Sequence, residues 1–418
     1  MNISTTAEAF VPFLKQHKLI IKREEEGNYK LIMLSLFKVL LEAETYIRKC
    51  SIDKTTYTST EHKVEDHVQL TKNTRFFPKV IRKYIQDTPC SLIKYTCDIL
   101  GRENNIYFYS YTSGTGPSGT GPNIPNQVKL MFMWLYICIK YAEDKCAKEL
   151  NIYIFLTPFK KTLPTKKTTI LSAEHVNTAF TYCCLPEGEI TIFRAEEWFK
   201  VFLHESFHAY NLDFGLTTIP ASLREQLRTF FHINSDFNIN EAYTETWARI
   251  INSILYSFAS LTEREKKFET FLMYTEFCLQ LERLFSLYQM NKILDFMGLN
   301  YSDIYSPGRD SYMKSHLYKE DTHVFGYYIL TAIFLNDYKA FMQWCAVINK
   351  NENNIIKFDC RTESFQKMAT YIRSIYANPN LLSLLSLLQS KQIKSRDELL
   401  TTTRMAVIDL VDMQKINM

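Results

Sequence analysis

The segment that decides the fold spans residues 198–210 and has the sequence WFKVFLHESFHAY. It contains the pattern HExxH, in which His204 and His208 are four residues apart and Glu205 follows the first histidine. On an α-helix such side chains share one face, about 5–6 Å apart, so both imidazoles could reach one metal ion. The apolar residues 201–203 favour a buried helix. We therefore predict a helix over 195–210 that carries a zinc site, with Glu205 as the general base.

A catalytic zinc needs a third protein ligand, and the sequence INEAYTE at residues 239–245 offers the best candidate. Glu241 and Glu245 in this segment are also four residues apart. On a helix, Glu241 could bind the metal while Glu245 accepts the ring N–H of a ligating histidine. The alternative is that both glutamates belong to a solvated helix face. HExxH also occurs by chance, so a protein without zinc stays open as an alternative.

These two segments resemble the gluzincin metallopeptidases, and in particular the thermolysin-like pattern of HExxH followed by Asn-Glu-Ala-x-x-Asp. The resemblance implies that His204, His208 and Glu241 bind one Zn²⁺ per chain and that Glu205 is the general base. It also implies that Glu245 orients a ligating histidine. Glu245 stands where the family has an aspartate, which is one methylene shorter. The fold implied is a zincin-like catalytic core around the HExxH helix.

The resemblance extends weakly to residues 174–180, upstream of the HExxH helix. They are similar to the family's substrate-binding edge strand, in which Asn177 would hold a peptide backbone and Ala179 would offer main-chain groups. The alternative is an internal strand that has no contact with substrate, with His175 as a packed or surface residue.

The family also has a histidine or tyrosine in its later helical domain that donates a hydrogen bond to the oxyanion. His323 and Tyr327 are the candidates for this catalytic role, and Tyr243 is a third. The alternative is that these aromatic residues belong to the hydrophobic core, because the segment 321–328 opens an apolar helix.

Hydrophobic periodicity predicts an α+β chain that is mainly helical, with one small mixed sheet before its middle. Helices are expected at 6–50, 130–150, 195–210, 241–258, 263–288, 324–349 and 396–412, and strands at 152–156, 168–171, 176–182 and 189–193. We divide the chain into a helical N-terminal region (1–110), a Gly/Ser/Pro loop (111–127), the zincin-like core with the metal site (128–245) and a helical C-terminal region (246–418). The loop contains SGTGP twice, at 113–122, and no P-loop lysine follows it.

The composition limits the partners and the location. A net charge of +4 without a run of basic residues does not favour nucleic acid. The N-terminal residues lack a signal-peptide pattern, and the apolar run 131–139 is far shorter than the about 20 residues that span a bilayer. We therefore expect a cytoplasmic protein that does not bind membranes. Ten cysteines without a CxxC pair indicate a reduced compartment, with Cys183 and Cys184 as packing residues.

Two functions follow from these patterns. The first is an intracellular zinc metallopeptidase that acts on peptides or proteins, with its helical region 246–418 closing over the cleft. The second is a structural or assembly protein that retains the metallopeptidase fold. Segments 175–178 and 196–205, together with the composition, are similar to uncharacterised proteins of large DNA viruses, which implies a virion- or capsid-associated role beside viral structural proteins. Glu205 favours the enzyme, because a structural zinc needs no general base.

Overall fold

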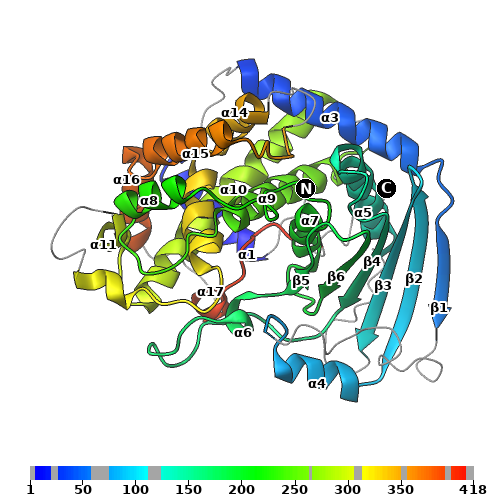
Figure 1. Ribbon diagram of the computed structural model, residues 1–418, viewed down its shortest axis with the longest axis horizontal. Coiled ribbons are helices and arrows are strands. Elements are labelled where there is room, and N and C mark those ends of the chain that lie inside the picture. The colour runs from blue at the N-terminus through cyan, green and yellow to red at the C-terminus, as the bar shows by residue number, and fades with distance from the viewer. Residues whose placement is uncertain are drawn as a thin grey trace.

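The computed structural model describes residues 5–19, 27–57, 75–111, 124–262, 266–305, 313–349, 355–390 and 397–410. The fold is α+β. Helices dominate it, and one six-stranded mixed sheet lies on one side of the molecule (Figure 1). The loop predicted at 113–122 lies outside the described residues.

The sheet has the strand order β1-β2-β3-β4-β6-β5, so β5 forms one edge. Parallel pairing joins β3 to β4 and β4 to β6, whereas the other pairs are antiparallel. The strands are β1 (Asp53–Tyr57), β2 (Cys90–Ile99), β3 (Arg102–Tyr111), β4 (Glu149–Phe155), β5 (Ala179–Thr181) and β6 (Glu187–Ile192). Because β3 and β4 run in the same direction, the chain needs a crossover between them, and this crossover contains helix α5 (Ile124–Tyr141).

Strands β1, β2 and β3 correct the predicted division of the chain into regions. The N-terminal region 1–110 is helical only in part, because residues 53–57 and 90–111 belong to the sheet. β2 and β3 form a tight hairpin through Leu100 and Gly101, whose positive φ angles suit a two-residue turn. The sheet is therefore larger than predicted. It also crosses the predicted boundary at 111–127, since β3 pairs with β4.

Other predicted elements differ in extent. Residues 168–171 are not a strand, because a turn from Lys166 to Thr169 interrupts them and only Leu171 makes a bridge, to Glu320. The helix predicted at 130–150 ends at Tyr141. The helix predicted at 396–412 is only the short α17 (Asp397–Thr401), because the next residues form an irregular segment.

Helices make up most of the remaining described chain, and the prediction of a helical C-terminal region is confirmed there. The first helices are α1 (Thr5–Glu8), α2 (Val11–Gln16), α3 (Gly27–Ile47), α4 (Lys79–Asp87), α6 (Ala173–Val176), α7 (Trp198–Ala209), α8 (Ala221–Phe230) and α9 (Ile239–Ala259). They are followed by α10 (Phe268–Phe296), α11 (Tyr301–Tyr305), the 3-10 turn η2 (Ser315–Leu317), the π-helix η3 (Phe325–Leu330), α13 (Thr331–Asn336), α14 (Tyr338–Asn349), α15 (Thr362–Ile375) and α16 (Pro379–Ser390).

Helix α7 lies at the centre of the fold, between the sheet and the C-terminal helices (Figure 1). On the sheet side, the ring of Trp198 packs edge-on against Phe108 of β3. On the α5 side, the indole N–H of Trp134 donates a hydrogen bond to Ser206 at 2.6 Å. The opposite face of α7 packs against α9, which is buried from Ala242 to Ala259. This packing fixes the position of the HExxH residues relative to α9.

Cys146 and Cys184 form a disulfide, so the prediction that Cys184 is only a packing residue is wrong. The parallel pairing of β4 with β6 explains the contact, because it brings together the segments that precede the two strands. The backbone N–H of Ala147 donates to Leu185 there at 2.7 Å. Cys183 has a free thiol.

Within the described part of the chain, no helix combines the length and the apolar character that crossing a membrane requires.

Candidate metal centre

The HExxH motif lies on α7 as predicted, and its side chains are buried rather than solvated. His204 is 4% exposed and Glu205 is 8% exposed, while His208 lies in the last turn and is partly buried. The start of α7 is fixed by Glu197, whose carboxylate accepts hydrogen bonds from the backbone N–H groups of the distant C-terminal segment 405–406. The two histidines therefore face α9 from a rigid helix.

Glu241 lies in the first turn of α9 and meets both histidines. Its Oε2 atom is 3.2 Å from Nε2 of His204 and 3.5 Å from Nε2 of His208, and the two Nε2 atoms are 3.2 Å apart. These three side chains form a group that could hold a metal ion. The same distances also allow hydrogen bonds among the three side chains.

Each histidine uses its second ring nitrogen to contact a carboxylate. Nδ1 of His204 is 3.0 Å from Glu245, which agrees with the role that the sequence predicted for this residue. Nδ1 of His208 is 2.8 Å from Asp213, a residue that the sequence interpretation missed. Such contacts orient the rings of metal-ligating histidines and fix their tautomers. The sequence contained one signal for this contact: Asp213 is an acidic residue only five positions after His208, just beyond the end of the helix.

Glu245 has a second partner, because the ammonium group of Lys200 lies 2.9 and 3.0 Å from its two oxygens. Both side chains are almost fully buried. Burial by itself raises the pKa of Glu245, but Lys200 and His204 outweigh it and lower the pKa to about 2. Glu245 is therefore an anion at neutral pH. It holds the His204 ring on one side and Lys200 on the other.

The structure brings Tyr327 to the site but not His323. The hydroxyl of Tyr327 donates to Oε2 of Glu241 at 3.0 Å, and its ring packs edge-on against His204. His323 contacts the rings of Phe76 and Tyr327 and does not line the pocket beside Glu205. Tyr243, the third candidate, is wrong as an oxyanion donor, since it is fully buried and donates to the carbonyl of Ile356.

The two predicted substrate-binding residues lie next to α7. Ala179 is the first residue of β5, the edge strand, and no strand of the described chain pairs with the other side of β5. Asn177 ends α6 just before this strand. Its side-chain oxygen accepts a hydrogen bond from Thr322 at 3.0 Å, and its backbone carbonyl accepts one from Arg194. Thus Ala179 occupies a strand edge as expected, whereas Asn177 precedes the strand.

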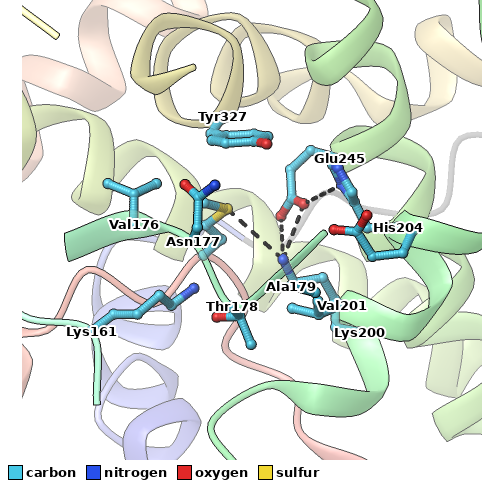
Figure 2. A pocket seen from close by; sticks show the side chains of 12 residues that line it. Lys161, Val176, Asn177, Thr178, Ala179, Lys200, Val201, His204, Glu245 and Tyr327 are labelled. Carbon is cyan, nitrogen blue, oxygen red and sulfur yellow. Dashed lines mark hydrogen bonds and ion pairs between the residues drawn. The ribbon is translucent and has the colours of Figure 1, made fainter. Parts of the chain in front are cut away.

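A small pocket that opens to solvent lies beside these three side chains. Residues from six parts of the chain line it, including Glu205. Figure 2 shows Asn177, Ala179, Val201, His204 and Tyr327 around the same space. Glu205 therefore faces the same space as His204. Burial raises the pKa of Glu205 above its ordinary value. A carboxyl group whose pKa moves toward neutrality is better suited to both taking up and releasing a proton.

Comparisons of the chain with protein-family models, with curated proteins and with solved structures found no match. The chemical interpretation of the site therefore depends on the geometry of its own residues.

Proposed function

We propose that the chain is a zinc-dependent metallopeptidase of the gluzincin type, with His204, His208 and Glu241 as zinc ligands. The observation that carries the proposal is the spacing of the three ligand atoms, which are separated by 3.2, 3.2 and 3.5 Å. A tetrahedral zinc ion with bonds of about 2.0–2.1 Å requires neighbouring ligand atoms about 3.4 Å apart. Two histidines and one glutamate also leave a fourth position for water, as in catalytic zinc sites.

The carboxylates around the ligands support the same proposal. Glu245 and Asp213 contact the outer ring nitrogens of His204 and His208, so each ring presents Nε2 to the site. This arrangement is typical of histidines that bind catalytic metals.

Glu205 and Tyr327 supply the remaining chemistry. A zinc ion bound at this site would lower the pKa of a water ligand and polarise the carbonyl of the scissile bond. Glu205 takes the proton of the attacking water and passes it to the leaving amine. The hydroxyl of Tyr327, which lies next to Glu241, donates to the oxyanion. An extended peptide binds along β5, whose outer edge offers main-chain groups at Ala179.

The experiment that tests the proposal measures metal content by plasma mass spectrometry, for the wild type beside Glu241→Ala. We expect about one zinc ion per wild-type chain and much less in the variant, because a three-residue site loses one ligand. The matched control is Glu225→Ala, which removes an exposed glutamate of α8 and leaves the metal content unchanged. A peptide library then tests cleavage.

The outcomes separate the two functions. Zinc together with peptide cleavage supports the enzyme. Zinc without cleavage of any library member contradicts it and favours the structural or assembly role. The absence of zinc from the wild type contradicts the metal site itself, and the close contacts among the three side chains are then hydrogen bonds.

A further inference from the structure

The pocket beside the metal group contains two buried lysines. Lys161 is 1% exposed and Lys200 is 3% exposed, and both side chains line the pocket together with His204 and Glu205. In Figure 2 the ammonium end of Lys161 points toward the side of the pocket that Lys200 occupies. Lysines are almost never fully buried unless they are paired, so the partners of each ammonium group need to be identified.

The two lysines differ in how well their donors are satisfied. An ammonium group has three N–H donors. Lys200 directs its donors to both oxygens of Glu245 and, at 3.8 Å, to the sulfur of Met405. Lys161 has one partner among the described residues, Oε2 of Glu197 at 2.5 Å. Two donors of a buried cation are therefore left without a protein acceptor at the pocket wall.

A second buried donor lies on the same wall. The hydroxyl of Thr178 is buried, lines the pocket and has no hydrogen-bond partner in the described chain. The amide nitrogen of Asn177 likewise makes no hydrogen bond there, since only the oxygen of that side chain is used, by Thr322. Buried polar groups are normally satisfied, so several free donors around one small space indicate a missing acceptor.

We infer that this pocket binds a carboxylate of the substrate, held by Lys161 and the hydroxyl of Thr178. The inference rests on the proposed peptidase function and names its substrate class: peptides with an acidic residue, or a terminal carboxylate, next to the scissile bond. Val176, Ala179 and Val201 surround the pocket with apolar groups that suit the methylenes of such a side chain. A basic residue is disfavoured, because it would bring a third cation beside Lys161 and Lys200.

The charge of the site supports a carboxylate rather than a neutral group. Burial lowers the pKa of Lys161 below its ordinary value. A bound anion beside the ammonium group would raise this pKa and so favour the charged form. The carboxylate of Glu197 already accepts hydrogen bonds from the backbone N–H groups of Met405 and Ala406, so Lys161 is not its only partner. Lys161 can therefore share its charge with a second carboxylate.

The test uses peptide hydroxamates, which bind zinc and are not hydrolysed. Two probes differ only in the residue that follows the hydroxamate, which is glutamate in one and glutamine in the other. A second pair differs only in a free or amidated C-terminus. Titration calorimetry with the zinc-loaded protein gives the affinities. We expect a carboxylate probe to bind about 10- to 100-fold more tightly than its neutral partner, the range for a hydrogen bond to a charged group.

Variants assign the effect to Lys161. The double variant Lys161→Met with Glu197→Gln removes both charges of the pair, so no buried charge stays unpaired. We expect it to fold and to bind the two probes of a pair equally. The control Lys160→Met, which removes an exposed lysine paired with Glu398, should keep the wild-type preference.

The outcomes are distinguishable. If only the glutamate probe binds more tightly than its partner, the pocket binds an acidic side chain. If only the probe with the free C-terminus binds more tightly than its partner, the pocket binds a terminal carboxylate. Equal binding of both pairs by the wild type overturns the inference but leaves the peptidase function standing. A preference that persists in the double variant also overturns the role of Lys161. Failure of every hydroxamate to bind overturns the proposed function, and the inference falls with it.

Discussion

The two helices that carry the candidate metal ligands contribute opposite kinds of side chain. Helix α7 supplies nitrogen donors, from His204 and His208, and the ammonium group of Lys200. Helix α9 supplies the carboxylates Glu241 and Glu245, which contact all three. The charges thus compensate one another across a single helix contact. The pairing therefore satisfies the buried charges of both helices where they pack together.

Glu205 is the exception on α7, because it has no partner on α9 and faces the pocket instead. The comparison separates two kinds of residue. Loss of the Glu245 carboxylate leaves the buried ammonium group of Lys200 unpaired, so we expect it to affect folding. Loss of the Glu205 carboxylate leaves the pairing intact, so we expect it to affect only the proposed catalysis.

The variant Glu205→Gln should lose most of the proposed peptidase activity. General acid–base catalysis contributes typically about 10²- to 10⁴-fold, and the amide cannot take up the proton of the attacking water. Zinc content and the urea midpoint should stay at wild-type values, because glutamine has nearly the same shape and the ion pairs between α7 and α9 remain. Initial rates on a cleaved library peptide, with metal analysis of the same samples, measure both quantities. Full activity in the variant would exclude Glu205 as the general base.

The variant Glu245→Gln should destabilise the fold, in contrast to Glu205→Gln. It leaves the ammonium group of Lys200 buried without a counter-charge, which costs about 3–5 kcal/mol in free energy of unfolding. Urea denaturation of the metal-free protein measures this loss. The double variant Lys200→Met with Glu245→Gln removes both charges and should recover much of the stability. Equal stability of wild type and single variant would show that the pair contributes little.

The variant Asp213→Asn should weaken metal binding with a smaller effect on stability. Asp213 orients His208, and loss of such a carboxylate typically costs about 10- to 100-fold in metal affinity. Competition with a zinc chelator measures the affinity. Asp236→Asn is the matched control, because Asp236 is exposed and precedes α9. An unchanged affinity in Asp213→Asn would mean that His208 is oriented by the helix alone.

The parts of the site that depend on local spacing were predictable from the sequence. His204 and His208 on α7, and Glu241 and Glu245 on α9, follow the four-residue period of a helix. The spacing and the resemblance both predicted that Glu245 contacts a ligating histidine, and the structure identifies this histidine as His204. Asp213 does not follow such a period. It reaches His208 because Asn211 has a left-handed backbone conformation (φ 51°), which ends α7 and turns the chain back toward the helix.

The parts that depend on contacts between distant segments could not be predicted in this way. Strand β3 contains the aromatic run at residues 107–109, but its place in the sheet depends on pairing with β4, and the place of β2 depends on β3. The Cys146–Cys184 disulfide follows from the register of β4 with β6. Lys161 reaches the pocket from a connector that has no helical or strand period. These three features depend on how distant segments pack together, which local sequence patterns do not show.

Glu320 is a partly buried carboxylate that has no cationic partner among the described residues, in contrast to Glu245. It accepts hydrogen bonds from the hydroxyl of Ser235, from the hydroxyl of Tyr318 at 2.9 Å and from the backbone N–H of Phe325 at 2.7 Å. The last contact fixes the start of η3, which carries Tyr327. Burial outweighs these hydrogen bonds and raises the pKa of Glu320 to about 7. Glu245, with Lys200 beside it, shows the opposite shift.

This raised pKa predicts a pH dependence of folding. The unfolded chain releases the Glu320 proton near its ordinary pKa of 4.5, whereas the folded chain keeps it until about pH 7. The unfolded state therefore binds fewer protons in this range, and stability falls as the pH rises, by about 2 kcal/mol between pH 5 and pH 7. The neutral variant Glu320→Gln should lack this decrease. Urea midpoints at the two pH values measure it for wild type, variant and the exposed control Glu363→Gln. If wild type and Glu320→Gln respond equally to pH, Glu320 is ionised in the folded protein, and burial without a cation is not enough to keep its proton.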